Sequence, residues 1–109
     1  MVKIRYSAVA IRDLEQIGDY IAGNLKNPAA ALNTVRKIQN AIDNLADFPN
    51  IGTPLSPVSE ECADYRFLIC GNYLVFYRPQ TAEVYIDRIL YSKRDYLSIL
   101  FDEFLETET

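Results

Sequence analysis

Seven side chains in the second half of the chain are of types that bind anions or transfer protons. They are Arg66, Arg78, Arg88, Tyr91, Lys93, Arg94 and Tyr96. Arg66 and Arg88 fall on neighbouring or near-neighbouring predicted strands, where their guanidinium groups could converge on one anion, and a Tyr or Lys with a shifted pKa could act as a base. The structural alternative is that each arginine pairs with a carboxylate and braces the sheet. The candidate carboxylates are Asp64, Asp87 and Asp95.

Other catalytic groups are missing from the sequence. It has no histidine, and its two cysteines, Cys62 and Cys70, form no CxxC motif. We expect Cys70 to be a small core residue and Cys62 to be a loop thiol. Carboxylates are scattered along the chain, so the sequence predicts no metal site and no cofactor.

The charge of the chain argues against nucleic-acid binding by the surface as a whole. The formal net charge is −4, and the tail residues Asp102, Glu103, Glu106 and Glu108 supply four negative charges. Residues 1–101 therefore balance to zero. A protein that neutralises phosphates usually carries a clear basic excess, so only local clusters of cations remain as a basis for such binding.

Two features of the sequence predict a cytoplasmic protein. No run approaches the roughly 20 apolar residues that cross a bilayer. The N-terminal MVKIRYSAVAIRDL carries charges inside its apolar run, which is not the pattern of a signal peptide. We therefore expect no membrane partner.

Three short apolar runs must position the candidate residues. They span about 64–70, 73–78 and 83–91, and they are separated by Gly71-Asn72 and by 79–82. Tyr, Phe, Val and Ile dominate these runs, and tight connections make neighbouring strands antiparallel. The third run is apolar on both faces, which is typical of a strand inside a sheet. The sequence therefore predicts a three-stranded antiparallel meander.

The first half of the sequence predicts one strand and two helices. The opening VKIRY alternates apolar and charged side chains, which is typical of a strand with one buried face. Ser7 is a suitable N-cap for a helix over about 8–23. Asn27-Pro28 begins a second helix that runs to about Asp47. The short link between them makes the pair an antiparallel helical hairpin.

Apolar side chains at helical spacing define the face that each helix buries. The predicted stripes are Ala10, Leu14, Ile17 and Ile21 in the first helix and Leu32, Val35, Ile38, Ile42 and Leu45 in the second. Asp13, Glu15 and Asp19 fall largely outside the first stripe. Gly18 lies within the first helix at a cost of about 1 kcal/mol relative to Ala, which close approach of the second helix would explain.

Two further segments complete the chain. Residues 49–63 contain three prolines and one glycine without periodicity, so we expect a connector to the sheet, with a functional loop as the alternative. Ser92 and Asp95 resemble a capping box, which predicts a short helix over about 93–104 before a frayed acidic tail, 104–109. The predicted fold is a single α+β domain, 1–109, of order β-α-α-β-β-β-α, with an antiparallel sheet packed against the helical hairpin.

Several short motifs follow one another along nearly the whole chain. The first half has A-x-x-DL-x-x-I-x-x-YI over 10–21, NPAAA at 27–31 and L-x-x-FP-x-x-G over 45–52. The second half has YR-x-L from Tyr65, Y-x-V-x-YR from Tyr73, V-x-I-x-RIL from Val84 and RDY at 94–96. No single motif is diagnostic, but the ordered set resembles the RelE/ParE superfamily of bacterial toxins from type II toxin–antitoxin pairs.

The resemblance implies one of two activities, because RelE-like members cleave mRNA in the ribosome and ParE-like members poison DNA gyrase. Cleaving RNA through its 2′-hydroxyl needs a base, an acid and cations for the developing charge. The position after RIL, often His in the family, is Tyr91 here. The ParE-like branch therefore fits better, and the residues favour a protein that is not an enzyme. If the chain is an mRNA endoribonuclease, the catalytic candidates are Arg66, Arg88, Tyr91 and Arg94.

The resemblance also implies partners. A cognate antitoxin would place an extended or helical segment in a groove beside the helical hairpin, and DNA would be contacted only through the antitoxin. On this reading the seven residues named first bind the target, gyrase by resemblance, or the partner. The alternatives are a RelE-like ribosome-dependent mRNA endonuclease and a toxin-fold interaction module that has lost toxicity.

Overall fold

The computed structural model describes residues 2–55 and 64–91. Its elements, in chain order, are β1 (Lys3–Tyr6), α1 (Ala8–Asp19), the π-helical turn η1 (Tyr20–Asn24), α2 (Pro28–Asp43), the 3-10 turn η2 (Asn44–Ala46), β2 (Thr53–Pro54), β3 (Arg66–Cys70), β4 (Tyr73–Pro79) and β5 (Glu83–Tyr91). These elements confirm the predicted strand, helical hairpin and meander. The predicted C-terminal helix with Ser92 and Asp95, the acidic tail and Cys62 lie outside the described residues.

The sheet is mixed rather than antiparallel. Its order is β1-β5-β4-β3-β2, and β1 runs parallel to β5 while the other pairs are antiparallel. The antiparallel prediction is right for the meander and wrong for the first strand. Alternation identifies β1 as a strand but carries no information about its partner. The long crossover through both helices is what permits a parallel pairing.

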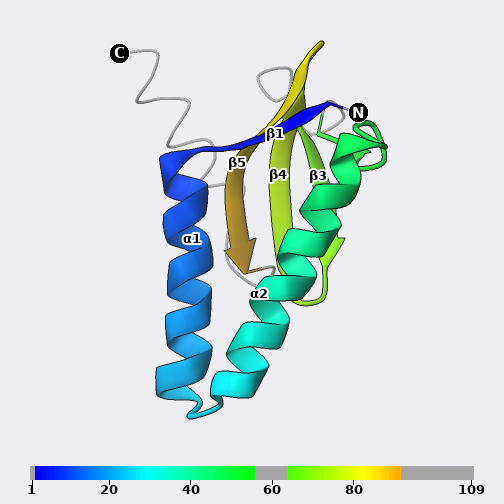
Figure 1. Cartoon of the computed structure of the whole chain (residues 1–109). Coiled ribbons are helices and arrows are strands. Elements are labelled where there is room, and N and C mark those ends of the chain that lie inside the picture. Colours follow the sequence, from blue (N-terminus) through cyan, green and yellow to red (C-terminus); the bar gives the residue numbers. More distant parts are fainter. Residues whose placement is uncertain (1, 56–63, 92–109) are drawn as a thin grey trace.

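Both helices pack on one face of this sheet (Figure 1). Ser7 Oγ accepts a hydrogen bond from the backbone N of Ala10 at 2.9 Å, and Asn27 Oδ1 accepts one from Ala30 at 3.1 Å, so both predicted N-caps are confirmed. The main core lies between the hairpin and the sheet and consists of Ala10, Leu14, Ile38, Ile42, Leu45, Val75, Tyr77, Val84, Ile86 and Ile89. Cys70 packs half-buried against this core as a free thiol.

Two helical side chains contradict the predicted stripes. Leu32 is 52% exposed. It precedes Ile38 by six residues, which turns it about 120° around the helix axis from that core residue, and Ala31 is buried in its place. Asp13 is 7% exposed, because it has partners on β5 that are described below. At Gly18, an added Cβ would lie 3.5 Å from Val35 Cγ2, so α2 is close but leaves room for a methyl group.

The other face of the sheet carries a second apolar cluster of Leu55, Tyr65, Leu74, Phe76 and Leu90. Because side chains alternate along β4, Val75 and Tyr77 point toward the helices. Leu74 and Phe76 point to the opposite face of the sheet. We call this side the far face. The predicted connector carries the two-residue strand β2, paired with β3, and its residues 56–63 lie outside the described part of the chain.

Candidate partner-binding site

The edge of β5 is only partly covered by β1. The parallel pairing runs from Glu83 to Ile86, after which a bulge makes Asp87 an extra residue between the partners of Tyr77 and Phe76. Ser7 compensates for the missing strand, because its backbone N donates to Ile86 O at 2.9 Å and its hydroxyl donates to Asp87 O at 2.7 Å. The residue that caps α1 therefore also closes part of the sheet edge.

Asp13 closes the next part of the same edge. Its Oδ2 accepts hydrogen bonds from the backbone N of Ile89 and from Nε of Arg88, both at 2.9 Å, and its Oδ1 accepts one from Nη2 of Arg88 at 3.2 Å. The two side chains are only 8% and 15% exposed. Two parallel bonds between a guanidinium and a carboxylate form the strongest common ion-pair geometry. The Arg88–Asp13 pair thus fixes α1 against β5.

The burial of Asp13 could have been predicted from its spacing in the sequence, although the predicted stripe left it out. Asp13 follows Ala10 by three residues and precedes Ile17 by four, which is the spacing of a buried helix face. A carboxylate at such a position indicates a buried partner. Its partner Arg88 is 75 positions away, so spacing alone could not identify it.

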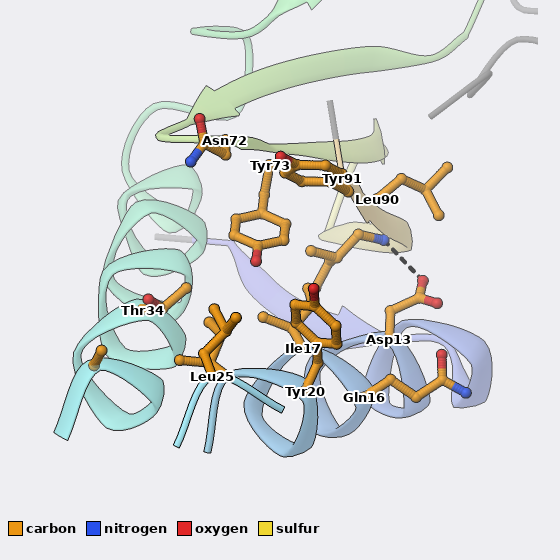
Figure 2. Close-up of a pocket in the computed structure, with 13 residues that line it drawn as sticks. Asp13, Gln16, Ile17, Tyr20, Leu25, Thr34, Asn72, Tyr73, Leu90 and Tyr91 are labelled. Atoms are coloured by element: carbon orange, nitrogen blue, oxygen red, sulfur yellow. Dashed lines mark hydrogen bonds between the residues drawn. The ribbon is translucent and has the colours of Figure 1, made fainter. Parts of the chain in front are cut away.

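An open groove of about 750 Å³ lies next to this ion pair. It runs between the end of α1 with η1, the start of α2, the β3–β4 turn and the end of β5. Figure 2 shows Tyr73 and Tyr91 on one side and Ile17, Tyr20 and Leu25 on the other, with Asp13 at one end. These residues give the groove a mainly apolar, aromatic lining.

The groove leaves large apolar side chains in solvent. Tyr20 is 53% exposed, Leu25 58% and Tyr91 37%. The π-helical turn η1 contributes Tyr20 and leads directly into Leu25, and such turns frequently occur at functional sites. Large, semi-rigid aromatic groups at a concave surface are typical of binding sites for a protein partner.

Tyr73 in the groove is poorly suited to proton abstraction. The ring of Tyr73 packs at 5.7 Å from that of Tyr91, centroid to centroid. Burial, and then the neighbouring phenols of Tyr91 and Tyr20, raise the pKa of Tyr73 above its usual value. A general base would need a lowered pKa, so the shift keeps this phenol protonated at neutral pH.

The structure does not bring the predicted arginines together. β4 separates Arg66 on β3 from Arg88 on β5. Nη1 of Arg66 donates to the carbonyl oxygens of Asn50 at 3.1 Å and Gly52 at 2.8 Å, so this side chain ties the connector to the sheet. The predicted convergence on one anion is therefore wrong for this pair. The bracing alternative fits better, with carbonyls and Asp13 as the partners in place of the predicted carboxylates.

The remaining predicted residues do not form one cluster within the described part of the chain. Tyr91 lines the groove. Arg78 lies on β4 with its guanidinium between the rings of Tyr65 and Tyr85. Lys93, Arg94 and Tyr96 lie outside the described residues. Within residues 2–55 and 64–91, no cluster of three His, Cys, Asp or Glu could hold a metal ion, and no helix is long and apolar enough to cross a membrane.

The sequence profile of the ParE toxin of the type II toxin–antitoxin system parDE matches residues 4–96. The chain belongs to the ParE toxin family. A curated relative of this ParE-family chain is the Sinorhizobium fredii protein Y4kP, to which a toxin function is attributed. The two are 40% identical over 52 residues, which are 48% of this chain and 52% of that protein, so the match spans about half the length of the relative.

Solved structures agree with this assignment. A chain of the chromosomal ParDE toxin–antitoxin system from P. aeruginosa superposes with a TM-score of 0.71 at 25% identity, covering 85% of this chain and 98% of that one. A chain of the RelBE2 toxin–antitoxin complex from Mycobacterium tuberculosis superposes with a TM-score of 0.53 at 23% identity, covering 84% and 93%. The second likeness, at 23% identity, is one of fold alone.

Proposed function

We propose that this chain is a growth-inhibiting toxin that acts by binding a target protein in the cytoplasm, with DNA gyrase as the target, and that a cognate antitoxin neutralises it. The observation that carries the proposal is the family match over residues 4–96. DNA enters only indirectly, because the antitoxin and not this chain contacts the operator. The function is therefore one of binding rather than catalysis.

The geometry supports binding over RNA cleavage. Two of the three candidate arginines that a nuclease would use to stabilise a developing phosphorane have other partners, since Arg88 binds Asp13 and Arg66 binds the carbonyls of Asn50 and Gly52. Tyr73 has a raised pKa, which disfavours its use as a base. The groove, in contrast, offers exposed apolar area at a concave surface, as a helix or strand of a partner requires.

The target is tested in cells and with purified components. Induction of the chain alone should arrest growth with a DNA-damage response and filamentation, and the purified chain should inhibit supercoiling by gyrase. Rapid arrest of translation, with cuts in ribosome-bound mRNA and unchanged supercoiling, would replace this proposal with the endonuclease. Unaffected growth at confirmed expression would point to an interaction module without toxicity.

The antitoxin groove is tested with a matched pair of substitutions. Leu25 lines the groove and is 58% exposed, whereas Ile51 lies outside it and is 63% exposed. Leu25→Asp should weaken binding of the antitoxin encoded by the neighbouring gene by about tenfold or more, measured by calorimetry. Ile51→Asp should leave the affinity unchanged within about twofold. Equal effects of both substitutions would place the antitoxin elsewhere on the toxin.

A further inference from the structure

Arg78 has an environment unlike that of Arg66 or Arg88. Its guanidinium carbon lies 5.3 Å from the ring centroid of Tyr65 and 5.1 Å from that of Tyr85. Within the described part of the chain, its Nε is buried and has no hydrogen-bond partner. A guanidinium held between two rings keeps its charge and its in-plane donors while losing water, so a donor without an acceptor is costly there.

The strand register explains how this stack forms. Arg78 on β4 is directly opposite Tyr85 on β5, and Tyr85 is directly opposite Arg5 on β1. Directly opposed residues share one face of a sheet, and Arg78 alternates with Tyr77, which points to the helices. Tyr65, Arg78, Tyr85 and Arg5 therefore form a row across the far face, on the side of the sheet away from the groove's helical wall.

Charged side chains around the row favour an anion. The side chain of Arg5 is 65% exposed, and Lys3 on the same face of β1 is exposed as well. Glu83 contributes one carboxylate, whose Oε1 lies 3.7 Å from Nη1 of Arg5. That contact is long and solvent-exposed, so it contributes little and leaves the row with a local positive excess. Arg78 is the half-buried centre of this excess.

We propose that the row of Tyr65, Arg78, Tyr85 and Arg5 is a binding site for the carboxylate of an Asp or Glu side chain on a partner protein. The two rings hold the guanidinium plane, and its terminal nitrogens, unlike the buried Nε, can donate to a planar acceptor that arrives from solvent. A carboxylate can accept from both terminal nitrogens at once. The low water content of the stack strengthens such a bond.

A carboxylate is favoured over a nucleic-acid phosphate by charge. Nucleic-acid binding gains its affinity from several cations that neutralise successive phosphates. The body of this chain balances to zero and the whole chain carries −4, so phosphates beyond the first would meet no matching excess. A single acidic side chain makes no such demand. The inference goes beyond the proposed toxin function, because it concerns a different face of the molecule.

The test follows the Nε–Hε signal of Arg78 by NMR in the full-length chain, assigned by triple-resonance experiments. Added hexaglutamate peptide should shift this signal saturably. Hexathymidylate, which carries a similar charge, should shift it less at the same concentration. The absence of a saturable shift with the peptide would overturn the proposal, and a tighter response to the oligonucleotide would reassign the row to nucleic acid. Both outcomes are read on the unmodified protein, so neither depends on a variant that folds.

Matched variants sharpen the result. Arg78→Lys keeps the charge but loses the planar pair of donors, so it should weaken hexaglutamate binding by about fivefold or more in fluorescence anisotropy. Arg12→Lys, an exposed arginine on α1, should leave the affinity unchanged. Unchanged affinity in both variants would mean that the peptide senses only overall charge, which contradicts a built site. The titration uses no gyrase and no antitoxin, so its outcome stands apart from the test of toxicity.

Discussion

Arg88 on β5 and Arg78 on β4 lie in two regions of one sheet, and their guanidinium groups have different partners. Arg88 makes two hydrogen bonds to the carboxylate of Asp13, at the corner where α1 meets the sheet edge. Arg78 lies between two tyrosine rings on the far face, and its buried Nε lacks an acceptor within the described residues. The first arrangement pairs the guanidinium within the chain, and the second leaves one buried nitrogen without an acceptor among the described residues.

This difference between Arg88 and Arg78 distinguishes an arginine with a structural role from one that we propose to have a binding role. The helix-facing side of the sheet pairs its polar groups, because Asp13 also accepts from Ile89 N and the hydroxyl of Tyr77 accepts from Gly52 N at 2.9 Å. Such satisfied groups hold a fold in one arrangement. The buried Nε of Arg78, which has no acceptor among the described residues, contributes no such order.

The largest expected effect is that of Asp13→Ala. It leaves the guanidinium of Arg88 and the amide of Ile89 without their acceptor in a nearly buried site, which should lower the free energy of unfolding by about 3–5 kcal/mol. Denaturant unfolding measures this change. Glu15→Ala, at an exposed position on the same helix, should change it by less than about 0.5 kcal/mol. Equal losses of stability in the two variants would mean that the Asp13–Arg88 pair does not stabilise the contact between α1 and β5.

The next effect is steric and concerns the connector. A Cβ on Gly52 would lie 2.6 Å from Oη of Tyr77 and 2.8 Å from the carbonyl oxygen of Phe67. Because Tyr77 is fully buried, neither neighbour can move freely, and Gly52→Ala should cost about 1–3 kcal/mol of stability. Gly23→Ala is the control, since nothing lies within 4 Å of its added Cβ. A thermal melt in which both variants match the parent would contradict the close packing at Gly52.

The comparison also shows what the sequence could and could not predict. Ser7, Asn27 and Gly71 act through neighbours a few residues away, so local patterns predicted both helix starts and the β3–β4 turn, where Gly71 has a φ of 59°. The parallel pairing of β1 with β5 and the Asp13–Arg88 pair join positions about 80 residues apart, and no local pattern encodes them. The groove was expected in outline, but its π-helical turn was not.

A smaller effect is expected from alkaline pH. Burial is the main reason that the pKa of Tyr77 is raised from 10.0, although the Gly52 amide and Arg66 lower it in part. Burial likewise raises the pKa of Tyr6, Tyr73 and Cys70. The folded state then retains protons that the unfolded chain releases, so stability should be constant near neutral pH and fall as pH rises above the ordinary values of 9.0 for the thiol and 10.0 for the phenols.

Tyr77→Phe separates the contribution of one phenol to that fall. The variant should be about 1 kcal/mol less stable at neutral pH, because the Gly52 amide loses its acceptor. Its loss of stability at alkaline pH should be shallower than that of the parent, because one titrating group is gone. Parallel profiles of stability against pH would show that Tyr77 does not contribute to the alkaline transition.

The smallest expected effect is the most informative for the contrast between the two arginines. Arg78→Met removes two ring contacts that favour folding and a buried unpaired Nε that opposes it, so the free energy of unfolding should change by less than about 1 kcal/mol. Arg88→Met, the matched substitution, leaves the buried carboxylate of Asp13 without its cation and should cost several times more. A large loss for Arg78→Met would make this side chain a structural brace like Arg88. A near-neutral result leaves an arginine that the fold does not need for stability, as a group retained for contact with another molecule would be.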